Sequence, residues 1–343
     1  MVDKIPVSGV RYGDMLQRAI ITSFLIVKCI LFGSYSQAQT PTSQLQPSQT
    51  PPPNLLSSRS VVLYDFNFTQ KELDEWQRGF QKAGIDPIAY FETDIVFSGK
   101  DMTNAMAAYF VSRQVSFIVI LDKAPGFQFT VTPFNGNPTL FNPGQSAWQL
   151  KNNKLSDLLT ALWQEAWRSQ KKANFLISDY PEMDIAVDAI KGNRQEFYAI
   201  DLKVDNLAIP KFGNAEMDKA LEDFFTNNYP LKFKIVDAGA DEQELRRKGF
   251  LYVLCFVQTR GVAAKEVLGY DLSKGEKNYA SITFPEGQLQ LKIIPADQPV
   301  YKFYFRHIDN GNIFLGTKWD ADVQWLDALR NHVIGFKQEL KIN

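Results

Sequence analysis

Two continuous apolar runs constrain the fold of this chain more than any other feature. Residues 116–121 (SFIVIL) and 251–257 (LYVLCFV) contain no charged side chain and at most one polar one. A strand of this kind is buried on both faces, which is typical of the centre of a parallel sheet covered by helices. We therefore expect an α/β fold, in which mixed sheets are flanked by helices.

A similar order of elements surrounds each run. The first half predicts strands and helices in the order 60–66, 69–84, 88–92, 101–114, 116–121, 127–133 and 154–170. The second half predicts the order 196–202, a helix through Met217 and Phe225, 231–236, 241–249, 251–257, 280–284, 289–294, 300–307, a hairpin turn at 309–312 and a helix at 320–340. The order predicts two similar β-α-β-α-β-β-α units, residues 59–174 and 195–343, related by internal duplication.

The residues before the first unit are typical of an export signal. An apolar stretch at 19–33 follows several basic residues, and Ser36 and Ala38 supply the small residues at the −3 and −1 positions of a cleavage site. Lys28 interrupts the stretch, which is too short to span a membrane comfortably. We therefore expect residues 1–38 to be a cleavable signal peptide, beginning at the first methionine or at Met15. The mature protein would then lie in the periplasm or outside the cell, with no transmembrane segment.

Two further segments are predicted to lie outside the units. Residues 39–58 are rich in Pro, Gln, Ser and Thr and show no apolar period, so we expect a disordered linker there. Residues 175–194 would connect the two units. Removal of the signal peptide takes Cys29 with it and leaves Cys255 as the last cysteine, inside an apolar run. Such a thiol makes no intramolecular disulfide and should be inert.

The composition and the order of elements narrow the class of protein. A net charge of −1 and a pI near 6.2 argue against a nucleic-acid partner. The order of elements, together with the export signal, resembles the small α/β domains of bacterial envelope proteins of the Tol and curli-secretion type, over most of residues 60–343. The resemblance implies a periplasmic binding or assembly role without catalysis, and no functional residue is transferred by it.

The usual catalytic patterns are missing from the sequence. There is no glycine-rich phosphate loop after a strand, no G-x-S-x-G turn and no set of Cys and His at metal-ligand spacing. The two histidines, His307 and His332, are interpreted as a surface residue and a residue at the edge of the core. An enzyme is therefore the less favoured interpretation, and no cofactor is predicted.

One chemical possibility comes from carboxylates at strand ends. Ligands of parallel α/β sheets bind beyond the carboxyl ends of the strands, where Asp65, Glu92, Asp94 and Asp122 are predicted to lie. Together they could bind Mg²⁺ or Ca²⁺ through oxygen ligands. The alternative is that they are ordinary loop and cap residues. In the second unit Asp201 and Asp237 would correspond to the first two positions, but no carboxylate corresponds to Asp122.

The favoured function is that of an exported envelope protein which binds a ligand or scaffolds an assembly without catalysis, with a protein partner in the envelope. The alternative is a carboxylate- or metal-dependent hydrolase with its site at the strand ends of the first unit. Aromatic side chains could anchor an interface, although most of those at helical spacing would belong to the core. The aromatic candidates are Trp148, Trp163, Trp167, Tyr180, Trp319 and Trp325. The ligand, the partner and the oligomeric state are left open.

Overall fold

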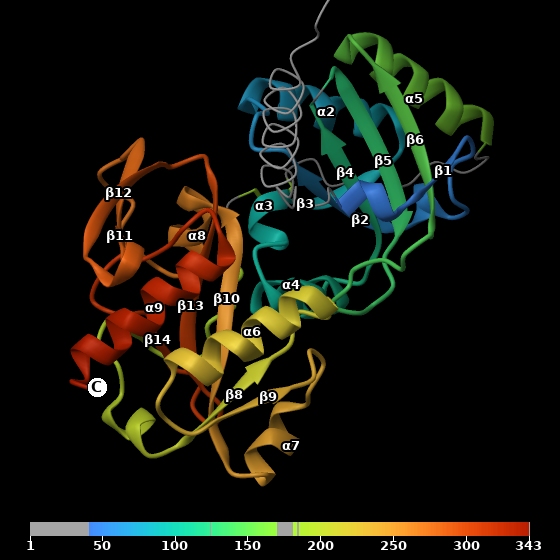
Figure 1. Cartoon of the computed structure of the whole chain (residues 1–343). Coiled ribbons are helices and arrows are strands. Elements are labelled where there is room, and N and C mark those ends of the chain that lie inside the picture. Colours follow the sequence, from blue (N-terminus) through green and yellow to red (C-terminus); the bar gives the residue numbers. More distant parts are fainter. Residues whose placement is uncertain (1–40, 124, 170–180, 184, 343) are drawn as a thin grey trace, which may run out of the picture. The chain divides into compact units, whose positions relative to one another are not determined.

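The computed structural model describes residues 41–123, 125–169, 181–183 and 185–342 (Figure 1). The predicted signal peptide and the first part of the predicted connector lie outside the described residues. Within the described ranges, no helix is both long enough and apolar enough to cross a membrane. Residues from Leu45 onward form one compact unit, and its two six-stranded mixed sheets with flanking helices confirm the predicted α/β class.

The first sheet mixes parallel and antiparallel strands. Its strands are β1 (Gln46–Ser48), β2 (Arg59–Tyr64), β3 (Asp86–Glu92), β4 (Val115–Asp122), β5 (Phe127–Pro133) and β6 (Ser146–Asn152). They lie in the order β1-β6-β5-β4-β2-β3. β2, β3 and β4 are mutually parallel, β5 and β6 continue antiparallel, and β1 pairs parallel with β6. The run at 116–121 therefore lies in the middle of the sheet, as its apolar character predicts.

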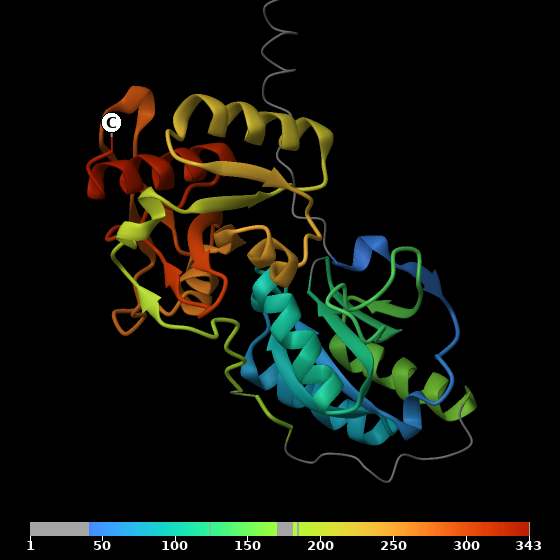
Figure 2. The same ribbon diagram turned by 90° about the horizontal axis from the view of Figure 1, so that it is seen from below.

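Helices cover both faces of the first sheet (Figures 1 and 2). One face carries α2 (Gln70–Ala83) and α5 (Leu155–Ser169), and the other carries α3 (Thr93–Val96) and α4 (Lys100–Ser112). α2 begins at Thr69, which forms a reciprocal capping box with Glu72, and ends at Gly84 in the left-handed conformation. Between these caps, Trp76 and Phe80 are fully buried against the sheet. Local sequence thus defines the helix at both ends.

The second sheet is built in the same way. Its strands are β7 (Arg194–Gln195), β8 (Asn206–Pro210), β9 (Phe233–Val236), β10 (Phe250–Arg260), β13 (Pro299–His307) and β14 (Ile313–Phe314). Figure 2 shows α6 (Ala215–Asn228) and α9 (Trp325–Glu339) side by side on one face, with α7 (Glu242–Arg247) on the other. Between β10 and β13 the chain inserts α8 (Gly261–Val267) and a separate hairpin of β11 (Asn278–Thr283) and β12 (Gln290–Pro295).

The two sheets share one topology. The second has the order β7-β14-β13-β10-β8-β9, which matches that of the first strand for strand. Each corresponding pair of neighbours also has the same relative direction. A duplicated chain would give this result. The duplication itself stays a prediction, because a shared topology does not by itself establish a common origin.

The predicted strand at 196–202 is wrong. This segment contains a 3-10 turn, η3 (Ile200–Lys203), and the first parallel strand of the second sheet is β8, which was not predicted. Tyr198 and Leu202 are buried, but Ile200 midway between them is 77% exposed, which breaks the alternation that one buried face of a strand would require. Asp201 therefore does not correspond to Asp65, and its carboxylate instead accepts a hydrogen bond from the Tyr252 hydroxyl at 2.7 Å.

The predicted disordered linker at 39–58 is also wrong over most of its length. Gln46–Ser48 forms β1, and Leu55 begins a second 3-10 turn, η2 (Leu55–Ser57). Although Pro, Gln, Ser and Thr dominate the segment, it also contains three leucines, Leu45, Leu55 and Leu56, whose side chains are buried in the first half. Burying them offsets the cost of ordering the backbone around them. A third 3-10 turn, η1 (Pro41–Gln44), precedes the compact unit.

Candidate functional site

Two of the four predicted carboxylates are engaged by an arginine from the second half. Glu92 ends β3 and Asp94 lies in α3, and both pair with Arg260 at the end of β10. Nη2 of Arg260 lies 2.6 Å from Oε2 of Glu92, and its Nε donates to the Asp94 carboxylate. The guanidinium also lies over the ring of Phe66, 3.8 Å from its centre. The positive charge beside these two carboxylates is therefore that of Arg260, whereas the sequence suggested that a bound Mg²⁺ or Ca²⁺ could lie there.

Asp65 and Asp122 lie at the ends of β2 and β4. Asp65 accepts hydrogen bonds from the backbone N–H and the side-chain amide of Asn67, at 3.0 and 2.9 Å. Burial, and then the neighbouring charge of Asp65, raise the pKa of Asp122 to about 6. In the part of the chain that the structure describes, no three or more His, Cys, Asp or Glu residues are grouped to hold a metal ion. The four predicted carboxylates therefore do not converge on one cation site.

The raised pKa of Asp122 gives a prediction about stability. The native state holds the Asp122 proton up to about pH 6, whereas the unfolded chain releases it near pH 3.8. The contribution of this group to stability is therefore present at low pH and is lost as the pH rises through 6. We expect Asp122→Asn, which mimics the protonated acid, to gain about 2 kcal/mol at pH 7.5 and clearly less at pH 4.5.

Urea unfolding of both proteins at the two pH values measures this difference. Asp223→Asn, at an exposed position in α6, serves as the control. A gain at Asp122 that is independent of pH, or equal to that of the control, would contradict the assignment.

A crevice lies at the carboxyl end of β8, in the middle of the parallel part of the second sheet. α6 leaves β8 over one face of the sheet toward β9, and α7 returns over the other face to β10. The ends of β8 and β10 therefore have no crossover between them, and ligands of α/β sheets bind at such positions. The crevice has a volume of about 230 Å³, and Pro210, Lys211 and Phe212 form its edge at β8. In the first unit, the sequence predicted a site at the equivalent position, beyond the carboxyl ends of the parallel strands.

The walls of the crevice are mostly apolar, with a few polar groups that converge. The apolar side chains are Phe212, Leu221, Leu245, Val253, Leu254, Phe256 and Phe303. The guanidinium of Arg306 donates two hydrogen bonds to the Glu242 carboxylate. Asp101, from the first turn of α4, accepts a hydrogen bond from the Tyr304 hydroxyl at 2.8 Å and lies 3.3 Å from Arg306 Nε. An apolar cavity with few, placed polar groups is typical of a small-molecule binding site.

Cys255 lies in the wall of this crevice and is half-buried. Burial raises the pKa of its thiol to about 12, and the nearby Asp101 charge acts in the same direction. The thiolate is therefore a minor species at neutral pH, and the group is a poor nucleophile there. The crevice suits binding better than thiol chemistry.

The sequence offered little to identify the polar residues of the crevice. Asp101, Glu242 and Arg306 lie on three separate elements, and no local pattern relates them. Glu242 is predicted only as part of the helix at 241–249, and β8, which places the crevice, is not predicted as a strand. The order of the strands could have located the crevice. Once that order is known, the gap between the ends of β8 and β10 can be identified without knowing any side-chain position.

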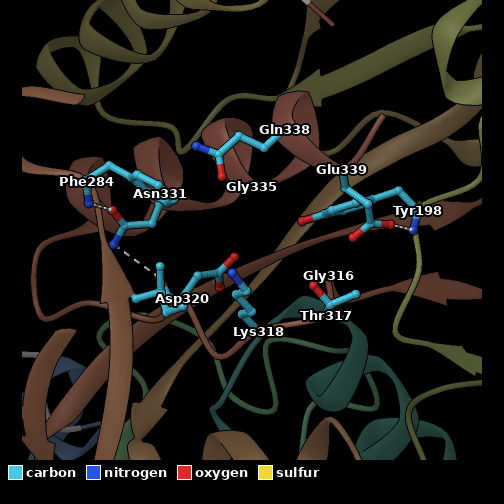
Figure 3. A pocket seen from close by; sticks show the side chains of 11 residues that line it. Tyr198, Phe284, Gly316, Thr317, Lys318, Asp320, Asn331, Gly335, Gln338 and Glu339 are labelled. Carbon is cyan, nitrogen blue, oxygen red and sulfur yellow. Dashed lines mark hydrogen bonds between the residues drawn. The ribbon is translucent and has the colours of Figure 1, made fainter. Parts of the chain in front are cut away.

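A second cavity, of about 250 Å³, lies between α9 and the loop that follows β14 (Figure 3). Beneath it, Nζ of the fully buried Lys302 lies 2.6 Å from Oδ1 of Asp320 and donates to the Leu315 carbonyl at 2.6 Å. The other oxygen of Asp320 lies 3.2 Å from Nδ1 of His332, which is 3.1 Å from the Tyr198 hydroxyl. Burial lowers the pKa of His332, and the Lys302 charge lowers it further. His332 is therefore a neutral core residue, more deeply buried than the sequence suggested.

The polar groups around this second cavity mainly serve the fold. Asn331 accepts from the backbone N–H of Phe284 and donates to the Asp320 carbonyl, and Glu339 accepts from the backbone N–H of Tyr198 (Figure 3). These bonds attach α9 to the neighbouring loops and to Phe284, the residue that follows β11. Nε2 of His332 is buried without a hydrogen-bond partner among the described residues, but His332 does not line the cavity. Because the buried polar side chains that line the cavity already have partners within the chain, this cavity is a weaker ligand site than the crevice.

A third cavity, of about 440 Å³, has Glu92, Met102 and Met106 in its wall. Its charged rim contains an Asp188–Arg194 pair, with 2.7 Å between Oδ1 and Nη2. Glu92 is taken by Arg260, as described above. The cavity thus combines adaptable methionines with charges that are mostly neutralised, which gives a ligand little to recognise.

Comparisons of the chain with protein-family models, with curated proteins and with solved structures find no match. The resemblance to envelope proteins of the Tol and curli-secretion type stays a prediction that rests on the order of elements. The crevice at the end of β8 is the candidate functional site, on the strength of its own geometry.

Proposed function

We propose that this chain is an exported protein of the cell envelope that binds a small, largely apolar ligand without converting it. The observation that carries the proposal is the crevice at the carboxyl end of β8, where the topology opens a gap and the walls are apolar. Its volume of about 230 Å³ is small for a ligand site, so the ligand should be small as well. Export is supported by the N-terminal sequence alone.

The contacts around the four strand-end carboxylates favour binding over hydrolysis. Glu92 and Asp94 are held by Arg260, and Asp65 is held by Asn67. A general base needs a free carboxylate within reach of its substrate. The hydrolase alternative is therefore left with Asp122 and its neighbour Asp65, whose Oδ1 already accepts two hydrogen bonds from Asn67. Among the described residues no third His, Cys, Asp or Glu is grouped with them to hold a metal ion.

A protein partner is the second candidate, and two exposed tryptophans favour it. Trp163 and Trp167 on α5 are 44% and 73% exposed, and their rings stack 6.5 Å apart. Large exposed aromatic side chains are enriched at protein interfaces. Trp148 and Trp319 are buried and Trp325 is half-buried, as expected of core residues, whereas Tyr180 lies outside the described residues.

The binding proposal is tested with 3-phenyl-1-propanol, a neutral apolar probe. We expect saturation-transfer NMR to detect its binding, with millimolar to high micromolar affinity for so small a compound. The location is read from Cys255. Because its raised pKa makes the thiol react slowly, labelling with N-ethylmaleimide is followed at pH ~8.5, where the thiolate fraction is larger, and the bound probe should slow the labelling further. Mass spectrometry of the peptide containing Cys255 measures that rate separately from any reaction at Cys29.

Protein already modified at Cys255 is the matched control, because the adduct fills part of the crevice. It should bind the probe more weakly than the unmodified protein. Binding that neither protects Cys255 nor weakens after modification would place the ligand elsewhere, and no binding at all would refute the proposal.

A further inference from the structure

The carboxylates of the crevice are already paired. Glu242 accepts two hydrogen bonds from the Arg306 guanidinium, and Asp101 accepts one from the Tyr304 hydroxyl. A cationic ligand would have to displace one of these donors and leave it buried without a partner. That displacement is unfavourable, because an unsatisfied buried donor loses its interaction with water as well.

The cations of the crevice are less well paired. Nζ of Lys100 donates to the main-chain carbonyl of Ala238 at 3.3 Å, and Nζ of Lys211 lies 3.5 Å from Asp237, whose side chain is 89% exposed. Arg306 Nε has no hydrogen-bond acceptor within the described residues, although Asp101 lies nearby. Three cations against two carboxylates leave the lining with a net positive charge. A lysine ammonium on its flexible stem can turn toward a ligand at little cost.

We propose that the ligand of the crevice is a small amphipathic anion, an aromatic or branched aliphatic carboxylate. Its apolar part would lie against Phe212, Phe256 and Phe303, and its carboxylate would be bound by Lys100 and Lys211. This inference rests on the proposed function, since it concerns the same crevice. Lys100 begins α4, which packs on the first sheet, whereas Lys211 follows β8 of the second. The anion would therefore bridge residues from both halves of the chain.

Three probes with the same apolar group separate charge from shape. They are 3-phenylpropionate, 3-phenyl-1-propanol and 3-phenylpropylamine, measured by NMR titration of the full chain at neutral pH. We expect the anion to bind about tenfold more tightly than the alcohol, because its bonds to ammonium groups are charge-assisted. The amine should bind more weakly than the alcohol. Affinity for the anion should fall between low salt and 0.5 M salt, whereas affinity for the alcohol should not fall.

A double variant assigns the effect to the two lysines. Lys100→Gln with Lys211→Gln should weaken the anion about tenfold and change affinity for the alcohol less than twofold. The matched control, Lys71→Gln with Lys203→Gln, removes the same net charge from exposed positions outside the crevice and should leave both affinities unchanged. Retained binding of the alcohol shows that the double variant is folded. If the variant does not fold, the salt dependence in the wild type decides the question.

The outcomes separate this inference from the proposed function. If the alcohol binds as tightly as the anion, or if salt leaves affinity for the anion unchanged, the crevice binds apolar ligands without selecting an anion and the inference is wrong. If none of the three probes binds, the proposed function itself fails. Tighter binding of the amine would also overturn the inference, because the two carboxylates would then be available to a ligand.

Discussion

Replacing Asp320 with asparagine is expected to destabilise the protein by about 3–5 kcal/mol, because the substitution leaves a buried ammonium group without its counter-charge. Lys302 is fully buried, and its Nζ lies 2.6 Å from Asp320 and 2.6 Å from the Leu315 carbonyl. Asparagine keeps the size of the side chain and removes its charge. The amide oxygen can still accept a hydrogen bond from the ammonium but cannot balance its charge, so the ammonium either stays buried as an uncompensated cation or loses its proton. Both outcomes reduce the free energy of unfolding.

The pH dependence of the variant has a definite sign. Burial lowers the pKa of Lys302, and Asp320 opposes this shift in the wild type. Without Asp320 the pKa of Lys302 falls further, so the unfolded chain holds this proton over a wider range of pH than the native state. Stability of the variant should therefore rise with pH below the unfolded lysine value near 10.4. Chemical unfolding at pH 7 and pH 9.5 should show a smaller deficit at the higher pH.

Two further variants make the Asp320 test specific. Asp327→Asn removes the partner of Arg330 in an exposed pair on α9, with 2.6 Å between the charged atoms, and should cost less than about 1 kcal/mol. Lys302→Met combined with Asp320→Asn removes both charges and should recover most of the lost stability. A loss of under 1 kcal/mol in Asp320→Asn, or no recovery in the double variant, would show that the pair is not a buried ion pair in solution.

Much of the fold follows from local sequence. The run at 116–121 predicts a central buried strand, and β4 is that strand. The strand predicted at 127–133 has the bounds of β5, although four successive residues, 129–132, are buried, so both of its faces are covered there. The capping residues around Trp76 define α2. These elements form because their own side chains settle the backbone conformation and the buried face together. Packing against neighbouring strands then buries apolar side chains that the local sequence has already placed.

The elements that were missed depend on tertiary pairing. β8 has five residues and ends in proline, so its sequence contains only a short apolar pattern. The segment is a strand because it pairs with β9 on one side and with β10 on the other. β1 has three residues and depends in the same way on its pairing with β6. Pairing of this kind supplies the backbone hydrogen bonds that a short segment cannot provide for itself, and no local pattern records it.

The candidate site was located only in part, for the same reason. The rule that ligands bind at the carboxyl ends of parallel strands was applied to the first sheet, where the carboxylates are conspicuous in sequence. There Arg260, from β10 of the second half, pairs with both Glu92 and Asp94. Local composition cannot predict a contact between Asp94 and Arg260, which are 166 positions apart in the sequence. The crevice of the second sheet needs Asp101 from the first half, which is equally hidden.

The Arg260 contact leads to the second large expected effect. Arg260→Met should destabilise the protein by about 2–3 kcal/mol, because it leaves the Glu92 and Asp94 carboxylates without the guanidinium that both use. The side chain of Arg260 is 10% exposed, whereas those of Glu92 and Asp94 are 32% and 34% exposed. Water can therefore solvate the two carboxylates in part, which keeps the expected loss below that for Asp320→Asn.

The loss should be concentrated where β10 meets α3. Beside Arg260, the Thr259 hydroxyl donates to the Asp94 carbonyl at 2.8 Å, and the backbone N–H of Gln258 donates to the Ser98 carbonyl at 2.6 Å. Hydrogen exchange read by mass spectrometry should show faster exchange over residues 93–99 in the variant, with the central strands β2 and β4 unchanged. Local opening of this kind requires only the free energy of the lost contacts, not that of global unfolding.

The choice of control variants decides what the Arg260 effect means. Arg113→Met removes an arginine that is 40% exposed and lies 2.8 Å from its carboxylate partner, Glu182, and it should cost less than about 1 kcal/mol. Arg260→Lys should fall between wild type and Arg260→Met, because one ammonium cannot reproduce the planar arrangement with two carboxylates. Adding Glu92→Gln and Asp94→Asn to Arg260→Met should restore stability in part, by removing two unpaired charges. If the triple variant is no more stable than Arg260→Met and exchange at 93–99 is unchanged, the guanidinium does not hold this junction together.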